Sequence, residues 1–392
     1  MIAYNRAWLD ALKIKEKAQE WFKKGLINQT VTASGAWQEG VSKSVKDKYP
    51  EDFYSPNVFI RIGLFIFGSI LIGAIAAFIA LLFGMDSTNG FAIICLFLGI
   101  LCFVALENIV KKHYQSGLDD VFLYAGLWFI IGGLAFMIFK FDGLLSLACL
   151  AFPFLLFASI RYIDRLLTTL TFSCLGLIII LFFQKIAPSV AVYILPFIGM
   201  IYSSTAYFWT IKNKDKYDLR HWSGNFDILE AASLIAFYAS GNYYVLQQAG
   251  LAYFGIETVA MAWLFWIFTF AVPMAYIYSG LMRRDRWMLN IGLICVAASI
   301  LSYRFYFHIM SIEVAAILGG AALLAIAYFS IKYLNKNKTS YTYEQDDNNK
   351  SLFANSEALI IAQSFGHQTP TADDKPIFGG GDFGGGGASD NY

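Results

Sequence analysis

The sequence of residues 58–83 is VFIRIGLFIFGSILIGAIAAFIALLF, with Arg61 as its one charged residue. About 20 apolar residues are enough for a helix to cross the hydrocarbon core of a bilayer. Nine further apolar stretches follow, with short loops between them. The ten predicted spans are residues 58–83, 90–110, 120–139, 142–160, 166–184, 187–210, 227–248, 256–281, 287–307 and 313–334. The sequence therefore predicts an all-α protein, a polytopic integral membrane bundle of ten helices.

The composition of the 392-residue chain excludes several other classes. Only 15% of its residues are charged and 58% are hydrophobic, whereas a soluble protein has about 25% charged residues. The net charge of +1 at pH 7 provides no field that would attract nucleic acid. The five cysteines lie inside apolar stretches without metal-ligand spacing. We expect no disulfide framework, no metal site and no cofactor.

Basic residues alternate from loop to loop and predict the orientation of the chain in the membrane. The segment before the first span carries nine of them, whereas the loops after the odd-numbered spans carry at most one each. The loops after the even-numbered spans contain Lys111, Lys112, Arg161, Arg165, Lys212, Lys214, Lys216, Arg220, Arg283, Arg284, Arg286, Lys332, Lys336 and Lys338. An error in the number of spans would destroy this alternation, so both termini are expected in the cytoplasm.

The segments outside the predicted spans are of two kinds. Residues 1–57 form a polar cytoplasmic segment, with an amphipathic helix predicted over 4–25 on the stripe Ala7, Ala11, Ile14, Ala18, Trp21 and Gly25, and a second one over 30–48. Two interpretations of residues 1–48 stay open: they dock on a partner or on the protein's own cytoplasmic face, or they lie on the bilayer. Residues 335–392 form an acidic, Gly-rich tail whose composition is typical of disorder.

Polar residues inside a predicted span are hypotheses for function, because burying them in lipid is costly. The span over 227–248 is the most polar of the ten and is the predicted lining of a substrate path, with Asp227, Glu230, Asn242, Gln247 and Gln248 as its residues. A simpler interpretation treats Asp227 and Glu230 as a helix-capping cluster near Arg220.

A second group of polar residues lies near the outward side. Arg304 and His308 are four residues apart, and Glu257 and Glu313 begin neighbouring spans. Either these four form a charged, proton-sensitive mouth, or they pair at the membrane surface.

Two further patterns concern single spans. Glu107 lies one helical turn from Lys111, so an ion pair within the helix is expected.

Pro153, Pro196 and Pro273 fall inside three spans and are candidates for breaking them. Broken helices recur at the binding sites of transporters.

The order of parts resembles an uncharacterised bacterial family of predicted membrane proteins that carries a domain of unknown function. The residues that carry the resemblance are Trp21 and the run Gly25-Leu26-Ile27, followed by a first membrane helix from Val58 and closely spaced further helices. The resemblance implies a bacterial inner (plasma) membrane protein, and it implies no activity.

The sequence thus leaves two interpretations of function open. In the first, the protein is a transporter of small molecules or ions whose ten spans divide into two halves of five. In the second, it is a non-transporting scaffold or sensor that recruits a cytoplasmic partner through its N-terminal helices and tail. No catalytic motif is present, so we expect no enzymatic activity. The lipid bilayer is the one partner that the composition predicts.

Overall fold

The computed structural model describes residues 2–23, 53–54, 56, 58–83, 88–139, 143–255, 259–283 and 285–306, together with the single positions 317, 321, 328 and 332. The chain divides into two units. The first contains Met1–Lys17 and Val31–Ile317, and the second contains Ala18–Thr30 and Leu318–Tyr392. All contacts discussed below lie within the first unit.

The described part of the chain is built from helices, as predicted. They are α1 (Arg6–Lys23), α3 (Val58–Phe83), α4 (Thr88–Ile109), α5 (Leu118–Phe139), α6 (Leu144–Tyr162), α7 (Arg165–Ile186), α8 (Pro188–Lys214), the 3-10 helix η1 (Tyr217–Trp222), α9 (Ser223–Gly241), α10 (Tyr243–Phe254), α11 (Ala262–Arg283) and α12 (Arg286–Tyr306). Eight of these helices are long and apolar enough to cross a membrane. The prediction of an all-α fold is confirmed for the described residues, and the eight apolar helices are compatible with an integral membrane protein.

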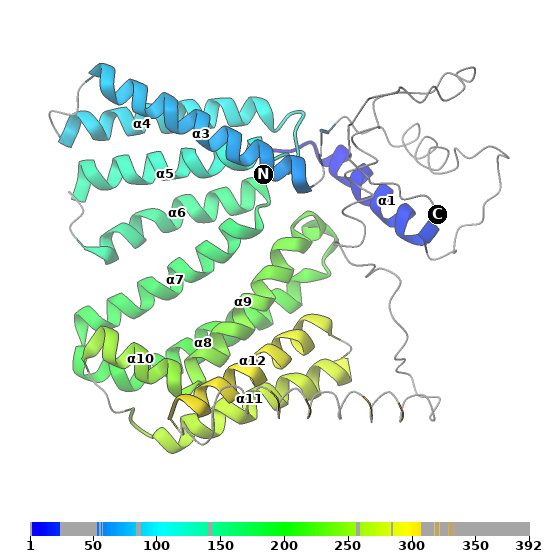
Figure 1. Cartoon of the computed structure of the whole chain (residues 1–392), viewed down its shortest axis with the longest axis vertical. Helices are drawn as coiled ribbons and strands as arrows, with labels where there is room; N and C mark the ends of the chain where they lie inside the picture. The colour runs from blue at the N-terminus through cyan, green and yellow to red at the C-terminus, as the bar shows by residue number, and fades with distance from the viewer. Residues whose placement is uncertain are drawn as a thin grey trace, which may run out of the picture. The chain divides into compact units, whose positions relative to one another are not determined.

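Consecutive helices pack as antiparallel neighbours (Figure 1). The most extensive contacts join α4 to α5, α6 to α7, α8 to α9 and α11 to α12. Glycine permits the close approach of α4 and α5, since a Cβ atom added at Gly99 would lie 2.6 Å from the Ile130 side chain. Helix α9 contacts α7, α8, α11 and α12, so it is the central helix of the second half of the bundle.

Two features of the predicted spans differ in the structure. The span over 227–248 is not one helix, because the chain is extended at Asn242 and divides into α9 and α10. The three prolines were expected to break helices, but Pro153, Pro196 and Pro273 lie inside the continuous helices α6, α8 and α11. The tenth predicted span, over 313–334, lies outside the described residues except for four single positions.

The N-terminal segment binds to loops at one end of the helices. The Ala3 backbone N–H donates to the Arg161 carbonyl at the end of α6, over 2.9 Å. Lys13 donates to Ser223 at the start of α9, and Arg220 of η1 pairs with Asp10. These contacts bring two loops that follow even-numbered spans to the same end of the bundle. We call this end, next to residues 110–117, 163–164 and 215–222, the basic-loop end.

The buried side of α1 differs from the predicted apolar stripe. Leu9 and Ala11 are each only 4% exposed, whereas Ile14 is 38% exposed. Trp8 packs edge-on against Phe53 at a ring distance of 5.0 Å. The contact with the rest of the chain therefore buries Ala11 of the predicted stripe together with Leu9 outside it, whereas Ala7 and Ile14 of the stripe are exposed. The second predicted helix, over 30–48, lies outside the described residues.

Candidate functional site

The break between α9 and α10 occurs at Asn242. Its backbone has an extended conformation, and its side-chain oxygen accepts a hydrogen bond from the Val245 N–H over 3.1 Å. This arrangement is an N-cap, which satisfies one of the free N–H groups at the start of a helix. Asn242 is 1% exposed, so the new helix begins inside the protein. One polar residue thus ends one helix and begins the next.

A network of neutral polar groups holds this break against α12. The Asn242 amide donates to the Tyr238 hydroxyl over 2.8 Å and to the Ser302 hydroxyl over 3.1 Å. The Tyr238 and Ser299 hydroxyls are 2.9 Å apart. Buried polar groups that find no partner cost free energy, above all in a membrane. The network therefore makes a helix break tolerable inside the bundle.

Pro273 contributes to the same network from α11. A proline has no backbone N–H, so the carbonyl four residues earlier loses its helical partner. That carbonyl belongs to Thr269, and it accepts a hydrogen bond from the Ser299 hydroxyl over 2.6 Å. The Thr269 hydroxyl in turn accepts from the backbone N–H of Tyr243, at the first position of α10. The proline does not break its helix, but it frees a carbonyl that joins α11 to α12.

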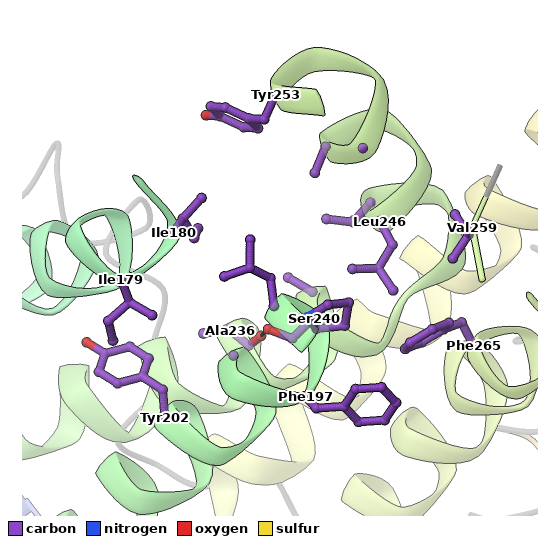
Figure 2. A pocket seen from close by; sticks show the side chains of 18 of the residues that line it. Ile179, Ile180, Phe197, Tyr202, Ala236, Ser240, Leu246, Tyr253, Val259 and Phe265 are labelled. Carbon is purple, nitrogen blue, oxygen red and sulfur yellow. Dashed lines mark hydrogen bonds between the residues drawn. The ribbon is translucent and has the colours of Figure 1, made fainter. Parts of the chain in front are cut away.

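A cavity of about 460 Å³ lies on the other side of the break (Figure 2). Its walls come from α7, α8, α9, α10 and the start of α11. The lining segments are the later part of α7, the first half of α8 and the last turns of α9. Since α7 begins at the basic-loop end, the cavity lies in the half of the bundle away from that end.

The lining of the cavity is apolar, and its polar side chains are all hydroxyls. They belong to Ser173, Tyr193, Tyr202, Ser240 and Tyr253. Among the described residues that line the cavity, none has a charged side chain. These residues therefore offer no counter-ion to a charged ligand, which makes this lining unfavourable for ions.

Tyr202 of α8 and Ser240 of α9 both border the cavity and carry hydroxyl groups (Figure 2). The Tyr202 hydroxyl donates to the Phe172 carbonyl over 2.7 Å, and the Ser240 hydroxyl donates to the Ala236 carbonyl over 2.9 Å. A Cβ atom added at Gly199 would lie 2.4 Å from Ser240 Oγ. Only glycine thus leaves room for the Ser240 hydroxyl between α8 and α9.

The structure does not place the predicted path residues around this cavity. Asn242 belongs to the network with α12, and Gln247 accepts a hydrogen bond from the Tyr306 hydroxyl. Gln248 is half-buried in α10 and is not among the lining residues. The cavity is lined instead by the apolar side of α9 and α10, which carries Ala236, Ala239, Ser240, Val245, Leu246, Ala249 and Gly250.

Asp227 and Glu230 form a separate ion cluster with Lys214. The Lys214 Nζ atom lies 2.8 Å from Asp227 and 2.9 Å from Glu230, whose side chain is 2% exposed. Arg220, the expected neighbour of this cluster, pairs with Asp10 of α1 instead. Twelve residues separate Glu230 from Asn242, which is about 18 Å along a helix. The five residues therefore lie in two separate groups, and the predicted substrate path stays a prediction.

Most of the predicted outward cluster lies outside the described residues. This applies to Glu257, His308 and Glu313. Arg304 is described and lies in the last turn of α12. The prediction of a charged mouth stays a prediction.

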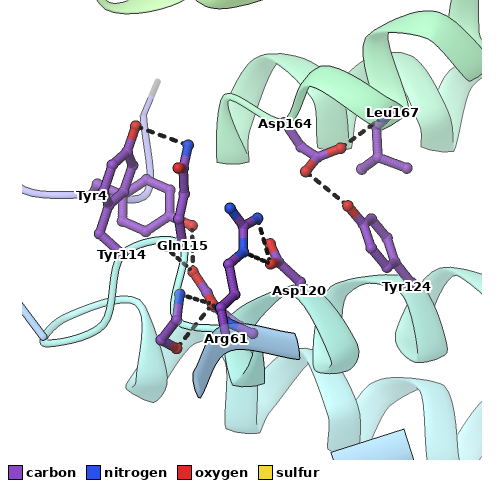
Figure 3. A network of polar contacts seen from close by, with 11 residues as sticks. Tyr4, Arg61, Tyr114, Gln115, Asp120, Tyr124, Asp164 and Leu167 are labelled. Carbon is purple, nitrogen blue, oxygen red and sulfur yellow. Dashed lines mark hydrogen bonds and ion pairs between the residues drawn. The ribbon is translucent and has the colours of Figure 1, made fainter. Parts of the chain in front are cut away.

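Sequence reasoning missed a group of ion pairs and hydrogen bonds at the basic-loop end (Figure 3). Arg61 of α3 binds Asp120 of α5 through two nitrogens, at 2.9 and 2.6 Å. The Tyr124 hydroxyl donates to Asp164, which also caps α7 at the Leu167 N–H. The partners are 40 or more positions apart in sequence, so local spacing carries no signal for them.

Glu107 also has a different partner from the one expected. Arg161 of α6 binds both of its carboxylate oxygens at 2.8 and 2.9 Å, and the Tyr162 hydroxyl donates to it over 2.7 Å. Lys111, the expected partner, donates to Asn108. A bidentate arginine contact is geometrically more specific than a lysine contact, and it joins α4 to α6.

Asp119 organises the loop before α5 and the N-terminal segment. It accepts hydrogen bonds from the backbone N–H groups of Gln115, Ser116 and Gly117, over 2.8 to 3.1 Å. The Tyr4 hydroxyl donates to the same carboxylate over 3.2 Å. Burial, together with the nearby negative charges of Asp119 and Asp120, holds the pKa of Tyr4 well above its usual range. Tyr4 therefore remains a hydrogen-bond donor at physiological pH.

Comparisons of the chain with protein-family models, curated proteins and solved structures find no match.

Proposed function

We propose that this protein is a transporter of small molecules in a bacterial inner membrane, with both termini in the cytoplasm. The observation that carries the proposal is the helix break at Asn242, which adjoins a cavity of ligand size. Ligand pockets have volumes of about 300–1,000 Å³. Discontinuous helices beside such a cavity are a recurring feature of transporter binding sites.

The hydrogen bonds around the break also support this proposal, because they hold the interruption with specific partners on other helices. A helix interruption within the bundle needs replacement partners for the freed backbone groups. Here the Thr269 hydroxyl of α11 accepts a hydrogen bond from the freed N–H of Tyr243. The Ser302 hydroxyl of α12 accepts one from the Asn242 side chain, and Ser299 joins α12 to the Thr269 carbonyl.

The alternative interpretation is a scaffold or sensor that recruits a partner through residues 1–48. The described part of this segment favours it less, since Tyr4, Leu9 and Ala11 are buried against the protein's own chain. Their apolar surface is therefore not free for a partner. The family resemblance and the division into two halves of five spans remain part of the proposal.

The proposal is tested by whether the cavity opens in turn to each side of the membrane. Ala239 lines the cavity, so Ala239→Cys is introduced after replacing the five native cysteines by serine. A membrane-impermeant maleimide is added to whole cells and to inside-out vesicles. A transporter is labelled in both preparations, because it alternates between two openings.

The control for this experiment is Ala77→Cys on the exposed side of α3. A lipid-facing thiol is expected to react in neither preparation. Labelling of Ala239→Cys from one side only, or from neither side, would count against transport.

A further inference from the structure

The chemical character of the cavity limits what it can bind. The lining residues that the structure describes include no charged side chain and are predominantly apolar. An ion or a charged metabolite would lose its hydration against these residues without gaining a partner from them. An uncharged molecule with a large hydrocarbon part would instead gain from removing apolar surface from water.

The hydroxyls of Tyr202 and Ser240 limit which polar group the ligand can carry. The hydrogens of Tyr202 and Ser240 are already donated to backbone carbonyls of their own or a neighbouring helix. Each oxygen still has lone pairs that can accept a hydrogen bond. The polar group that fits beside them is therefore a donor, such as a hydroxyl on the ligand.

The position of Ser240 is set by α8. Because an added Cβ atom at Gly199 would come within 2.4 Å of Ser240 Oγ, the glycine keeps this hydroxyl against the cavity wall. The Ser240 oxygen, which would accept the ligand's hydrogen bond, is thus positioned by the packing of α8 against α9 and does not lie on a loop. Preorganisation of this kind lowers the cost of binding.

The outer part of the cavity carries exposed side chains that a membrane amphiphile would meet first. Tyr193 is 57% exposed and Tyr253 is 45% exposed. They lie near the start of α8 and the end of α10, away from the basic-loop end. Tyrosine is enriched where the hydrocarbon region meets the headgroups. Gln184 of α7 donates to the Tyr253 carbonyl over 2.6 Å, which joins the two sides of this opening.

We propose that the cavity binds one uncharged amphiphile from the surrounding bilayer, a single hydrocarbon chain whose hydroxyl donates to Ser240. The inference rests on the proposed function in one respect, since it names the class of substrate that would be transported. Binding itself is independent of transport and is measured separately.

The test uses the full-length protein in phosphatidylcholine vesicles and a hexadecanol that carries a photoreactive diazirine beside its hydroxyl group. Mass spectrometry of the illuminated protein locates the labelled residues. We expect labelling of α8 and α9 around Gly199 and Ser240 that excess unlabelled hexadecanol removes. Labelling at lipid-facing positions such as Leu81, which is 83% exposed, is expected to persist in the presence of excess unlabelled hexadecanol.

A matched pair of variants on α10 tests the location of the site. Ala249 lines the cavity, whereas Ala252 is exposed three residues further along the same helix. Ala249→Phe fills part of the cavity and is expected to lower the competed labelling at least tenfold. Ala252→Phe adds the same side chain outside the cavity and is expected to leave the labelling unchanged. Equal losses in both variants would overturn the assignment.

Ser240→Ala tests the hydroxyl. It is expected to weaken competition by hexadecanol about fivefold, since one net hydrogen bond is lost, and to leave competition by hexadecane unchanged. If unlabelled hexadecanol never competes in the wild-type protein, the proposed site is wrong even where Ala239→Cys shows access from both sides. If competed labelling occurs while Ala239→Cys reacts from one side only, the binding site stands and the transport proposal fails.

Discussion

The helices α3–α7 and α8–α12 handle their polar residues in different ways. In the first set, ionised groups pair between helices at the basic-loop end, as Arg61 does with Asp120 and Arg161 with Glu107. In the second set, Lys214 of α8 also pairs with Asp227 and Glu230 of α9. Further along α9, neutral groups extend to Asn242 and meet hydroxyls of α12. Charges are tolerated near helix ends, whereas neutral amides and hydroxyls are less costly deeper in a membrane bundle. Ion pairs therefore join helices in both sets, and the second set adds a neutral network deeper in the bundle.

The largest effect is expected from Asn242→Ala, which removes the central group of the neutral network. The substitution deletes an N-cap and leaves Tyr238 and Ser302 without this partner. We expect a loss of about 2 kcal/mol in the free energy of unfolding, because a cap contributes about 1 kcal/mol and each hydrogen bond between membrane helices about 0.6 kcal/mol. Reversible unfolding in mixed micelles measures this loss.

Gln248→Ala is the control for that substitution, since Gln248 lies on α10 outside the network. It is expected to change stability by less than about 0.5 kcal/mol. A loss for Asn242→Ala no larger than that of the control would show that the break is held by helix packing alone.

A smaller effect is expected from Arg161→Ala in the first set of helices. The side chains of Arg161 and Glu107 are 28% and 43% exposed, so solvent screens their interaction. We expect a loss of about 1 kcal/mol in the free energy of unfolding, near the upper end for partly exposed pairs. Lys111→Ala tests the partner that spacing within α4 indicated and is expected to have no measurable effect. If Lys111→Ala is the more damaging substitution, Glu107 pairs within its own helix.

These two substitutions also show what sequence alone could predict. Apolar length predicts where helices lie, and the first predicted span, 58–83, coincides with α3. Apolar length does not predict the break at Asn242, because the side chains that hold the break come from α11 and α12. From the sequence alone, an asparagine in an apolar run is equally compatible with a helix break and with a continuous helix that has one polar face.

The partners of ionised groups were predicted poorly for the same reason. Spacing reveals neighbours within one helix, such as Lys111 for Glu107, but the observed partner is 54 positions away. The cavity was even harder to predict from the sequence. It is lined mainly by alanine, glycine, aliphatic and aromatic residues, which are ordinary in any membrane helix. Its existence depends on how α7 to α10 pack, and no residue type signals it.

A pH-dependent effect is expected where the N-terminal segment meets η1. Burial lowers the pKa of His221; Asp10 opposes this shift, and the positive charges of Lys13, Arg220 and Arg6 add to it. The unfolded histidine, with a pKa of about 6.5, then binds more protons than the folded one. Stability is therefore complete above pH 6.5 and decreases as the pH falls through 6.5 toward the lowered pKa of the folded state.

Hydrogen exchange of residues 2–13 measures this effect when wild type and His221→Gln are compared at each pH. The wild-type segment is expected to lose protection below pH 6.5 relative to the variant, which has no titrating group at this position. Parallel behaviour of both proteins would show that His221 does not control the contact of α1 with η1.

The smallest effect is expected from Tyr4→Phe, at the other end of the N-terminal segment. The phenylalanine ring retains the edge-on contact with Tyr114, whose ring centre lies 5.0 Å from that of Tyr4. Asp119 loses one hydrogen bond but keeps those from three backbone N–H groups. We expect a loss of about 0.5 kcal/mol in the free energy of unfolding, at the low end for a single hydrogen bond. A loss comparable to that of Asn242→Ala would mean that the basic-loop end depends on the N-terminal segment as much as the second set of helices depends on its neutral network.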